Sequence, residues 1–262
     1  MTAAAAAGPL VSVVTVCLNS AAQLPGAIAS LAAQRWPERE WIVVDGGSTD
    51  GTLELVHGAP EPPARWLSEP DRGIYDAMNK GVALAQGEIV YFLNSDDRLH
   101  DPDVLADVAR AFAADPGLAL LFGPVRVVKP AAADVFATQR HVNRHTLPFV
   151  DACHQGLFAR RRLFDEVGQF DLRWRTSADY DWMLRAVRAG HRMAHLDRPL
   201  AVFAAGGMHV RDPAALAAER RALRLQYLSP TALALGSLAT RALTRVSRTL
   251  RGGLALGERR AA

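Results

Sequence analysis

Two adjacent carboxylates, Asp96 and Asp97, follow directly after a run of apolar residues at 89–93. The run contains β-branched and aromatic residues, which predicts a strand buried on both faces. Burying unpaired charge is costly, so packing alone does not explain two carboxylates at the end of such a strand. In open α/β sheets, ligands bind just beyond the carboxyl ends of the strands. The pair is therefore a candidate site for a hard divalent cation, Mg²⁺ or Mn²⁺, that would hold a diphosphate. In the alternative interpretation, Asp96 or Asp97 caps the helix that follows.

A further acidic residue, Asp179, stands near the start of a predicted helix. Thr176 and Ser177 are natural N-cap residues, and Gly190 is a natural helix terminator. Asp179 would then lie in the first turn, where exposed backbone N–H groups and the helix macrodipole favour its charged form. From this pattern alone, the simplest interpretation is an ordinary residue of a helix start.

These acidic residues must be positioned by strands and helices that alternate along the first half of the chain. Continuous apolar runs predict strands, and apolar stripes at helical spacing predict the helices between them. The alternation predicts a parallel, doubly wound α/β sheet up to about residue 125. The predicted strands lie at 10–18, 41–44, 65–67, 89–93 and 118–128, and a later one lies at 192–204.

The second half of the chain has a weaker pattern. Residues 129–153 show little periodicity, and we expect an irregular segment that crosses the sheet. Strand character resumes at 154–158, and residues 160–167 have the pattern of a short helix that ends at Gly168.

The predicted parallel half is long enough to hold a nucleotide, but it lacks the familiar phosphate loops. There is no G-x-G-x-x-G after the first strand and no G-K-[ST] sequence. A nucleotide would have to be bound by other means.

The composition limits the class of protein. The chain has 262 residues, 50% of them hydrophobic, which suits one large domain or a domain with a small appendage. A net charge of only +3 gives no overall field of the kind that marks a nucleic-acid-binding protein, and we expect no nucleic acid partner. Cys17 and Cys153 make no metal-type spacing and are expected to be reduced thiols of a cytosolic protein.

The two ends of the chain differ from its middle. Residues 1–9 lack the charged region and the long apolar core of a signal peptide, and we expect them to be disordered. No window of roughly 20 residues is apolar enough to span a bilayer. We assign residues 10–210 to the main domain and residues 211–262 to a basic helical tail.

The tail has a charge pattern of its own. Arg241, Arg245 and Arg248 recur at i, i+4 and i+7, so a helix there would present one basic face. This pattern suits an interfacial helix on anionic lipid, and an ordinary solvated helix face is an equal alternative. We expect a cytoplasmic protein, with peripheral attachment to the inner face of the cell membrane through the tail as one option.

Taken in order, the motifs resemble those of glycosyltransferase family 2. The resemblance covers roughly residues 10–210, and several blocks in a consistent order are more specific than any single motif. The similar blocks are Ser12–Val16 with Asn19, Val43–Thr52, Asp71–Gly81, Phe92–Asp97, His154–Gln155 through Gly168–Asp171, and Ala178–Arg185. Within the family, the sequence looks most similar to small bacterial enzymes that build surface or exported polysaccharides.

The resemblance implies a GT-A fold, with a Rossmann-like nucleotide-binding half on a mostly parallel sheet and a mixed acceptor half. It also implies transfer of a sugar, with inversion at the anomeric carbon, from a nucleoside-diphosphate sugar, with UDP favoured. The acceptor would be a hydroxyl of a glycan or a lipid-linked molecule in bacterial polysaccharide biosynthesis. Inversion needs one general base and no covalent intermediate, and the sequence shows no obvious activated Ser or Cys nucleophile.

The resemblance also implies roles for individual residues on the donor side. The Asn94–Asp96 triplet occupies the position of the family's D-x-D metal motif, so Mg²⁺ or Mn²⁺ is assigned mainly to Asp96, with Asp97 as a second ligand. Asp45 is expected to accept a hydrogen bond from the ring N–H of the base. The residues assigned to the nucleotide sugar are Thr15, Asn19, Asp45, Arg72, Asn79, Lys80, Ser95 and Asp96.

On the acceptor side, Asp179 stands where the family places its general base. Such a carboxylate, held ionised within reach of the acceptor hydroxyl, contributes on the order of 10²–10⁴-fold to the rate. His154 and Gln155 are assigned to the acceptor side, and His209 is a further candidate. A structural histidine is the alternative for either His.

Two other functions remain open on the sequence. A catalytically silent scaffold protein that binds a nucleotide sugar within a polysaccharide assembly complex would have no need of Asp45, Asp96 and Asp179 together. A sugar nucleotidyltransferase shares a similar nucleotide half. It would be expected to have a glycine-rich, basic phosphate loop after the first strand, where this chain has Cys17–Ser20.

Overall fold

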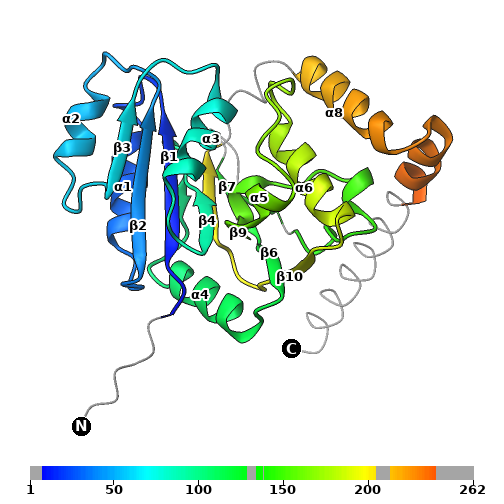
Figure 1. Cartoon of the computed structure of the whole chain (residues 1–262), viewed down its shortest axis with the longest axis horizontal. Helices are drawn as coiled ribbons and strands as arrows, with labels where there is room; N and C mark the ends of the chain where they lie inside the picture. Colours follow the sequence, from blue (N-terminus) through cyan, green and yellow to red (C-terminus); the bar gives the residue numbers. More distant parts are fainter. Residues whose placement is uncertain (1–7, 129–133, 138, 205–212, 240–262) are drawn as a thin grey trace, which may run out of the picture.

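The computed structural model describes residues 8–128, 134–137, 139–204 and 213–239. A seven-stranded sheet in the order β10-β6-β9-β4-β1-β2-β3 forms its centre (Figure 1). The strands of this sheet are β1 (Val11–Cys17), β2 (Arg39–Asp45), β3 (Arg65–Ser68), β4 (Ile89–Phe92), β6 (Leu118–Phe122), β9 (Leu157–Arg160) and β10 (Arg192–His195). All neighbours are parallel except β9, which pairs antiparallel with both β4 and β6.

β1 lies in the middle of the parallel half because its side chains are apolar or small on both faces. All seven of its residues are buried, and it pairs with β2 on one side and β4 on the other. Val13 and its alternating neighbours face one hydrophobic cluster, whereas Val14 and Val16 face the other. The continuous apolar pattern of the sequence therefore reflects a strand covered by helices on both sides.

Helices cover the two faces of the sheet. The elements α1 (Leu24–Ala32) and α4 (Val104–Ala114) bury Leu24, Leu31 and Phe112 in the cluster that contains Val13. On the other face, α3 (Ile74–Leu84), α5 (Leu163–Glu166) and α6 (Ala178–Arg188) join the cluster that contains Val14. A short helix, α2 (Thr52–His57), follows β2.

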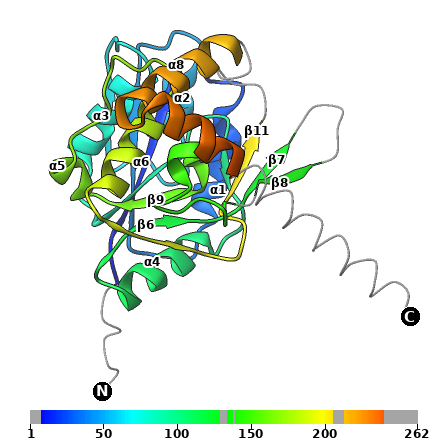
Figure 2. The ribbon, with the colours of Figure 1, turned by 90° about the vertical axis from the view of Figure 1, so that its right-hand side faces the viewer.

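A second, smaller sheet lies beside the first, and its strands β7 and β8 project from the molecule in Figure 2. Its order is β5-β11-β7-β8. These strands are β5 (Arg98–Leu99), β7 (Val125–Val128), β8 (Val135–Ala137) and β11 (Ala201–Ala204). The mostly parallel half and this mixed second half agree with the expected α/β architecture.

Two predicted strands are each divided between the two sheets. The expected strand at 118–128 is β6 and then β7, and the expected strand at 192–204 is β10 and then β11. Gly123 and Pro124 separate β6 from β7. Proline lacks the N–H that a continued ladder needs. A Cβ on Gly123 would lie 2.5 Å from the side chain of Leu200, so the chain can bend there only with glycine.

The segment expected to be irregular, residues 129–153, contains a strand and a short 3₁₀ helix in its described part. β8 occupies part of it, and the helix η1 covers Leu147–Phe149. It leads into a second 3₁₀ helix, η2 (His154–Gly156), immediately before β9.

The helix α8 (Pro213–Tyr227) packs on α6, although we assigned residues from 211 onward to a separate tail. Leu223 is fully buried, and the hydroxyl of Tyr227 donates to Asp181 at 2.8 Å. The guanidinium of Arg224 donates to the hydroxyl of Tyr180 at 2.9 Å and forms an ion pair with Asp151. The boundary at residue 210 therefore does not separate α8 from the domain. Residues 240–262, which include Arg241, Arg245 and Arg248, lie outside the described residues.

Candidate functional site

The carboxyl ends of β1, β2 and β3 meet at one edge of the large sheet, at the top of Figure 1. Cys17 is in register with Asp45, and Asp45 is in register with Ser68. The loops that follow these strands are tied together. The side-chain oxygen of Asn19, which has a left-handed φ of 49°, accepts from the backbone N–H of Thr49 at 2.9 Å. The edge is thus a fixed platform on which a ligand can bind.

Asp45 organises this platform from inside. Its side chain is fully buried, and its carboxylate accepts from the backbone N–H groups of Gly47 and Ser48 and from the hydroxyls of Ser48 and Ser68. Burial alone would raise the pKa of Asp45, but these hydrogen bonds hold it below its usual value. Its oxygens therefore have partners in the loop, and the expected contact with the ring N–H of a nucleobase stays a prediction.

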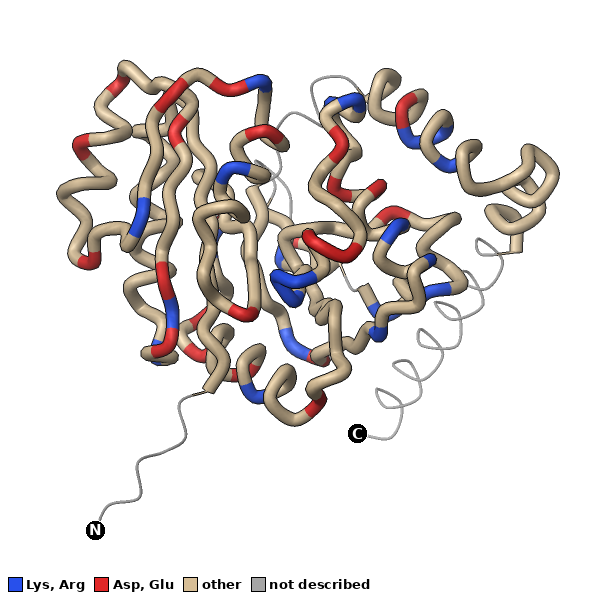
Figure 3. The backbone as a smooth tube through the Cα atoms, in the orientation of Figure 1, with Lys and Arg blue, Asp and Glu red and all other residues tan. Residues whose placement is uncertain are grey.

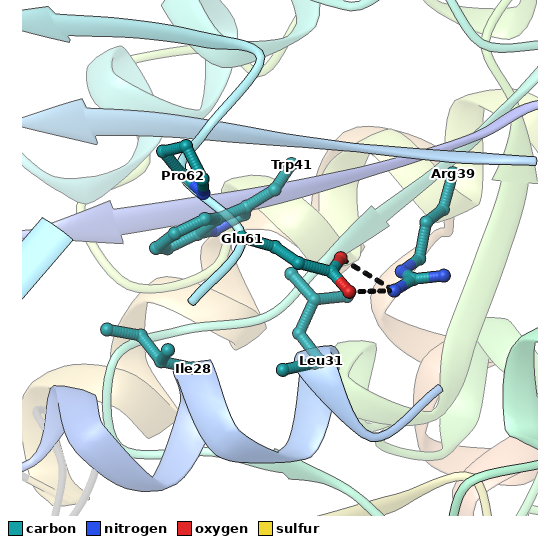
Figure 4. Close-up of a pocket in the computed structure, with 7 residues that line it drawn as sticks. Ile28, Leu31, Arg39, Trp41, Glu61 and Pro62 are labelled. Carbon is teal, nitrogen blue, oxygen red and sulfur yellow. Dashed lines mark hydrogen bonds and ion pairs between the residues drawn. The ribbon is translucent and has the colours of Figure 1, made fainter. Parts of the chain in front are cut away.

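Thr15 also has a structural role. It is 1% exposed, and its hydroxyl accepts from the indole N–H of Trp41 at 3.0 Å. Trp41 belongs to a pocket near the amino end of β2, away from the edge where the strands terminate (Figure 4). That pocket is lined by apolar residues and one ion pair: Ile28, Leu31, Ala32, Arg39, Trp41, Glu61 and Pro62. The expected contact of Thr15 with the nucleotide stays a prediction.

The three residues assigned from the third block have partners within the protein. The side-chain amide of Asn79 exchanges two hydrogen bonds with the backbone of Phe170, both at 2.9 Å, which fastens α3 to the loop before α6. Asn79 therefore links two elements, and its assignment to the nucleotide sugar stays a prediction. Lys80 pairs with Glu69 at 2.7 Å, and Arg72 pairs with Asp76 at 2.9 Å. Of these three, the Arg72 side chain is the one that reaches solvent, with 77% of its surface exposed.

The loop after β4 contains the candidate metal ligands. Ser95 and Asp96 are partly exposed, and the hydroxyl of Ser95 contacts that of Ser20 at 3.1 Å, which joins this loop to the loop after β1. Asp97 is fully buried, and neither of its carboxylate oxygens has a hydrogen-bond partner among the described residues. Burial, together with the charge of Asp96, raises the pKa of Asp97 to about 7. Its oxygens share this lack of partners among the described residues with the side-chain oxygen of Asn94, and the assignment of Asp97 as a second metal ligand stays a prediction.

The oxygen atoms of the loop after β4 fit a divalent cation. The carboxylate of Asp96 is accessible, and the side-chain oxygen of Asn94 is buried without a hydrogen-bond partner among the described residues. The described residues contain no group of three or more His, Cys, Asp or Glu side chains that would enclose a metal. Mg²⁺-type sites use one or two carboxylates and complete their shell with substrate phosphates and water. This loop has the oxygen donors for such a site.

Asp179 lies in the first turn of α6, as predicted, and is held by two other elements. The imidazole Nδ1 of His154, on η2, lies 2.8 Å from one carboxylate oxygen. The hydroxyl of Tyr75, on α3, donates to the other oxygen at 2.9 Å. Burial alone would raise the pKa of Asp179, but His154 and Tyr75 lower it below its usual value. These contacts thus favour the ionised carboxylate, although only 8% of the surface of Asp179 is exposed.

His154 connects Asp179 to the loop after β4. Its Nε2 lies 3.3 Å from the amide nitrogen of Asn94, two residues before Asp96. If Nδ1–H donates to Asp179, the Nε2 lone pair accepts from Asn94, and both contacts are satisfied by the neutral ring. Burial alone would lower the pKa of His154, but the hydrogen bond and the charge of Asp179 raise it. The candidate base and the candidate metal loop are therefore parts of one hydrogen-bonded network.

Gln155, which we assigned to the acceptor side, has partners within the protein, and its assignment stays a prediction. Its side chain is buried, and its carbonyl oxygen accepts from the thiol of Cys153 at 2.8 Å, while its backbone carbonyl accepts from Tyr91. Gln155 is thus a structural neighbour of the site. His209 lies outside the described residues.

An apolar pocket lies behind the His154–Asp179 pair. Such surroundings strengthen the electrostatic interactions of the pair. The lining residues are Met78, Val90, Phe92, His154, Leu157, Ala159, Phe164, Phe170, Asp179 and Trp182. Tyr75, which sequence reasoning missed, is the further residue that contacts Asp179 here; the only signal was its place in the block at 71–81.

Charge and hydropathy add two observations. Acidic and basic segments are interspersed along the chain, and α8 carries both signs (Figure 3). Among the described residues, no helix combines the length and the apolar character needed to cross a bilayer.

Cys17 and Cys153 are free thiols, as expected.

Comparison with known sequences identifies relatives. Residues 12–168 match the sequence profile of Glycosyl transferase family 2. A PGL/p-HBAD biosynthesis glycosyltransferase of Mycobacterium bovis is 38% identical over 184 residues, which cover 68% of this chain and 70% of the relative.

Comparison with solved structures gives the same fold. S. aureus TarS 1–349 in complex with UDP-GlcNAc superposes with a TM-score of 0.65 at 20% identity, covering 84% of this chain and 67% of that one. In a longer TarS structure, the chain spans 40% of that protein. The mannosyltransferase PcManGT of Pyrobaculum calidifontis, in complex with GDP-Man and Mn²⁺, superposes with a TM-score of 0.60 at 22% identity, covering 95% and 80%. The architecture is a GT-A fold.

Proposed function

The chain belongs to glycosyl transferase family 2, and we propose that it transfers a sugar from a nucleoside-diphosphate sugar to a hydroxyl group with inversion. The observation that carries this proposal is the Asp179 carboxylate, held ionised by His154 and Tyr75 beside the loop that contains Asp96. A general base at this position suits a single direct displacement at the anomeric carbon.

In this mechanism, Asp179 accepts the proton of the acceptor hydroxyl as its oxygen attacks the anomeric carbon. The bond between that carbon and the diphosphate breaks on the opposite face, so the configuration inverts and no covalent intermediate forms. Tyr75 and His154 fix the orientation of the carboxylate, and the buried setting keeps water from competing for it. His154 is a positioning residue in this scheme.

The leaving diphosphate carries developing charge that must be neutralised. A divalent cation supplies Lewis-acid stabilisation of that charge when bound. Asp96 would hold the cation, and the unpartnered oxygen of Asn94 is the second donor. Arg72, whose side chain is largely exposed at the same edge, is placed to contribute positive charge toward the phosphates.

The relatives support the class of donor and acceptor. TarS binds UDP-GlcNAc, and PcManGT binds GDP-Man and Mn²⁺, so a nucleotide-sugar donor and a Mn²⁺ or Mg²⁺ cofactor are the natural proposals here. The M. bovis relative is named for PGL/p-HBAD biosynthesis, which supports a glycan or lipid-linked acceptor in glycolipid or polysaccharide biosynthesis. A lipid-linked acceptor would place the reaction at a membrane surface, which the basic residues beyond position 240 suit.

The substitution Asp179→Asn tests the role of the base. The amide keeps the shape and can still accept from Tyr75, but it cannot take a proton. We expect the dissociation constant of the donor, measured by calorimetry, to stay within about threefold of the wild type. We expect release of the nucleoside diphosphate, measured by a coupled assay, to be about 10²–10⁴-fold slower.

Asp171→Asn is the matched control, because Asp171 is a carboxylate of the loop before α6 that pairs with Arg173 and not with His154. This control should turn over like the wild type. Unchanged turnover in Asp179→Asn would remove Asp179 from the mechanism.

A further inference from the structure

The end of β2 has a contact that the proposed roles do not explain. Gly46 follows Asp45 at the carboxyl edge, and the carboxylate of Asp71, in the loop after β3, lies directly over it. A Cβ at position 46 would be 2.7 Å from Oδ2 of Asp71 and 3.4 Å from the side chain of Leu18. A carboxylate can therefore occupy this place only because residue 46 has no side chain.

One oxygen of Asp71 is available to a ligand. Its Oδ1 accepts from the backbone N–H of Gly73 at 2.8 Å, which fixes the side chain. Its Oδ2 accepts no hydrogen bond from the described residues. The neighbouring carboxylates differ in this respect, because Glu69 pairs with Lys80 and Asp76 pairs with Arg72. Asp71 is thus a pre-positioned acceptor beside the fully occupied Asp45.

An apolar surface lies next to this acceptor. Leu18, the first residue after β1, is 56% exposed, although it contacts the same point above Gly46. Gly47 is exposed as well, and its φ of 91° is a conformation that favours glycine. An exposed leucine, open backbone and a single fixed acceptor together suit a flat heterocycle that has a ring N–H on its edge.

We propose that Asp71 recognises the base of the nucleotide donor, with Oδ2 accepting the ring N–H while Leu18 packs against the ring. A single free oxygen suits uracil, whose N3–H lies between two carbonyl groups. Cytosine and adenine present a ring acceptor at the corresponding place and would be repelled. Guanine presents a ring N–H and an amino group, which together call for both carboxylate oxygens. This inference rests on the proposed function and names its donor as a uridine diphosphate sugar.

The test compares the dissociation constants of UDP and CDP by calorimetry, with Mn²⁺ present, for the wild type and Asp71→Asn. In the variant, the amide oxygen can still accept from Gly73, so the amide nitrogen takes the place of Oδ2 and becomes a donor. We expect UDP to bind about 10–100-fold more weakly and CDP, whose N3 is an acceptor, to bind more tightly than in the wild type. An unchanged ratio of the two constants would overturn the inference.

Two further variants sharpen the result. Glu69→Gln removes the same charge two residues away and should leave the UDP-to-CDP ratio unchanged. Gly46→Ala keeps every charge but displaces the carboxylate of Asp71, so it should weaken UDP binding about tenfold or more without a change in melting temperature. Equal UDP binding in wild type and Gly46→Ala would contradict the proposed position of the base.

The outcome is separable from that of the proposed function. If the folded wild type binds no nucleoside diphosphate, the proposed function fails and this inference fails with it. If UDP binds but Asp71→Asn leaves the preference intact, only the role of Asp71 fails. Tighter binding of GDP than of UDP would overturn the assignment of uracil.

Discussion

At the scale of single residues, the central feature is a carboxylate whose ionisation depends on its neighbours. Asp179 is almost enclosed, and enclosure alone would favour its protonated form. The hydrogen bond and the charge of His154 reverse this tendency, and Tyr75 adds a second hydrogen bond. The proposed role of Asp179 as a general base requires an ionised carboxylate, which these contacts favour.

The pH dependence of turnover should report on this pair. Because the base must be ionised, turnover falls as pH drops through the pKa of Asp179, which His154 lowers. In His154→Ala, that pKa should rise, and the acid limb of the profile should move to higher pH. His154→Asn keeps a hydrogen-bond donor without a titrating ring, so its limb should lie between the two. The initial rate of nucleoside-diphosphate release, measured in brief assays from about pH 3 to pH 9, checks this. An acid limb at the same pH in all three proteins would show that His154 does not act on the base.

Sequence reasoning predicted where several candidate site residues lie in the fold, but not which partners their polar atoms have. Asp179 lies in the first turn of a helix and Asn94–Asp97 follow a buried strand, because both positions depend on local patterns. Thr15, Asp45 and Asn79 instead use their polar atoms on Trp41, Ser68 and Phe170, which are distant in sequence. Such partners become visible only when the chain is folded.

At the scale of elements, α8 is the part whose role the sequence obscured. Arg220 and Arg224 both pair with Asp151, and both guanidinium groups lie over the ring of Tyr180. Tyr180 is the residue after Asp179. The helix α8 thus supports the back of the element that carries the proposed base.

The substitution Arg224→Met tests this support. It keeps most of the apolar stem but removes the hydrogen bonds to Tyr180 and Asp151. Since hydrogen bonds of a charged group contribute about 1.5–3 kcal/mol, we expect the free energy of unfolding to fall by about that amount. Arg221→Met is the control, because Arg221 is exposed on the same helix and should change stability by less than about 0.5 kcal/mol. Urea titration distinguishes the two, and equal stability of both variants would mean that α8 is not held through Arg224.

The strand predictions show what local pattern can and cannot give. β1, β2 and β4 were predicted because a continuous apolar run is an adequate signal for a strand covered on both faces. The run at 118–128 is equally apolar, yet it passes from one sheet to the other at Gly123–Pro124. The residue that leaves no room for a side chain at position 123 is Leu200, which lies far along the chain.

At the scale of the whole molecule, two halves of the chain meet along one edge of the large sheet. The first half contributes the loops after β1, β2, β3 and β4. Asn19 and Ser20 link the loop after β1 to the loops after β2 and β4. The second half contributes η2 and α6, which carry His154 and Asp179. The contact between His154 and Asn94 joins the two halves. A nucleotide sugar bound by the first half would therefore present its sugar to Asp179, the proposed general base, in the second half.

The measurement that tests this account most directly is the release of nucleoside diphosphate from a panel of nucleotide sugars. The wild type and Asp96→Ala are compared, each with Mn²⁺ and with a chelator. We expect release of UDP from at least one UDP-sugar in Mn²⁺ and loss of that activity in chelator. In Asp96→Ala, we expect the rate to be at least about 10²-fold lower than in the wild type. Folded protein that turns over none of the donors, or that turns them over equally well with Asp96 replaced, would contradict it.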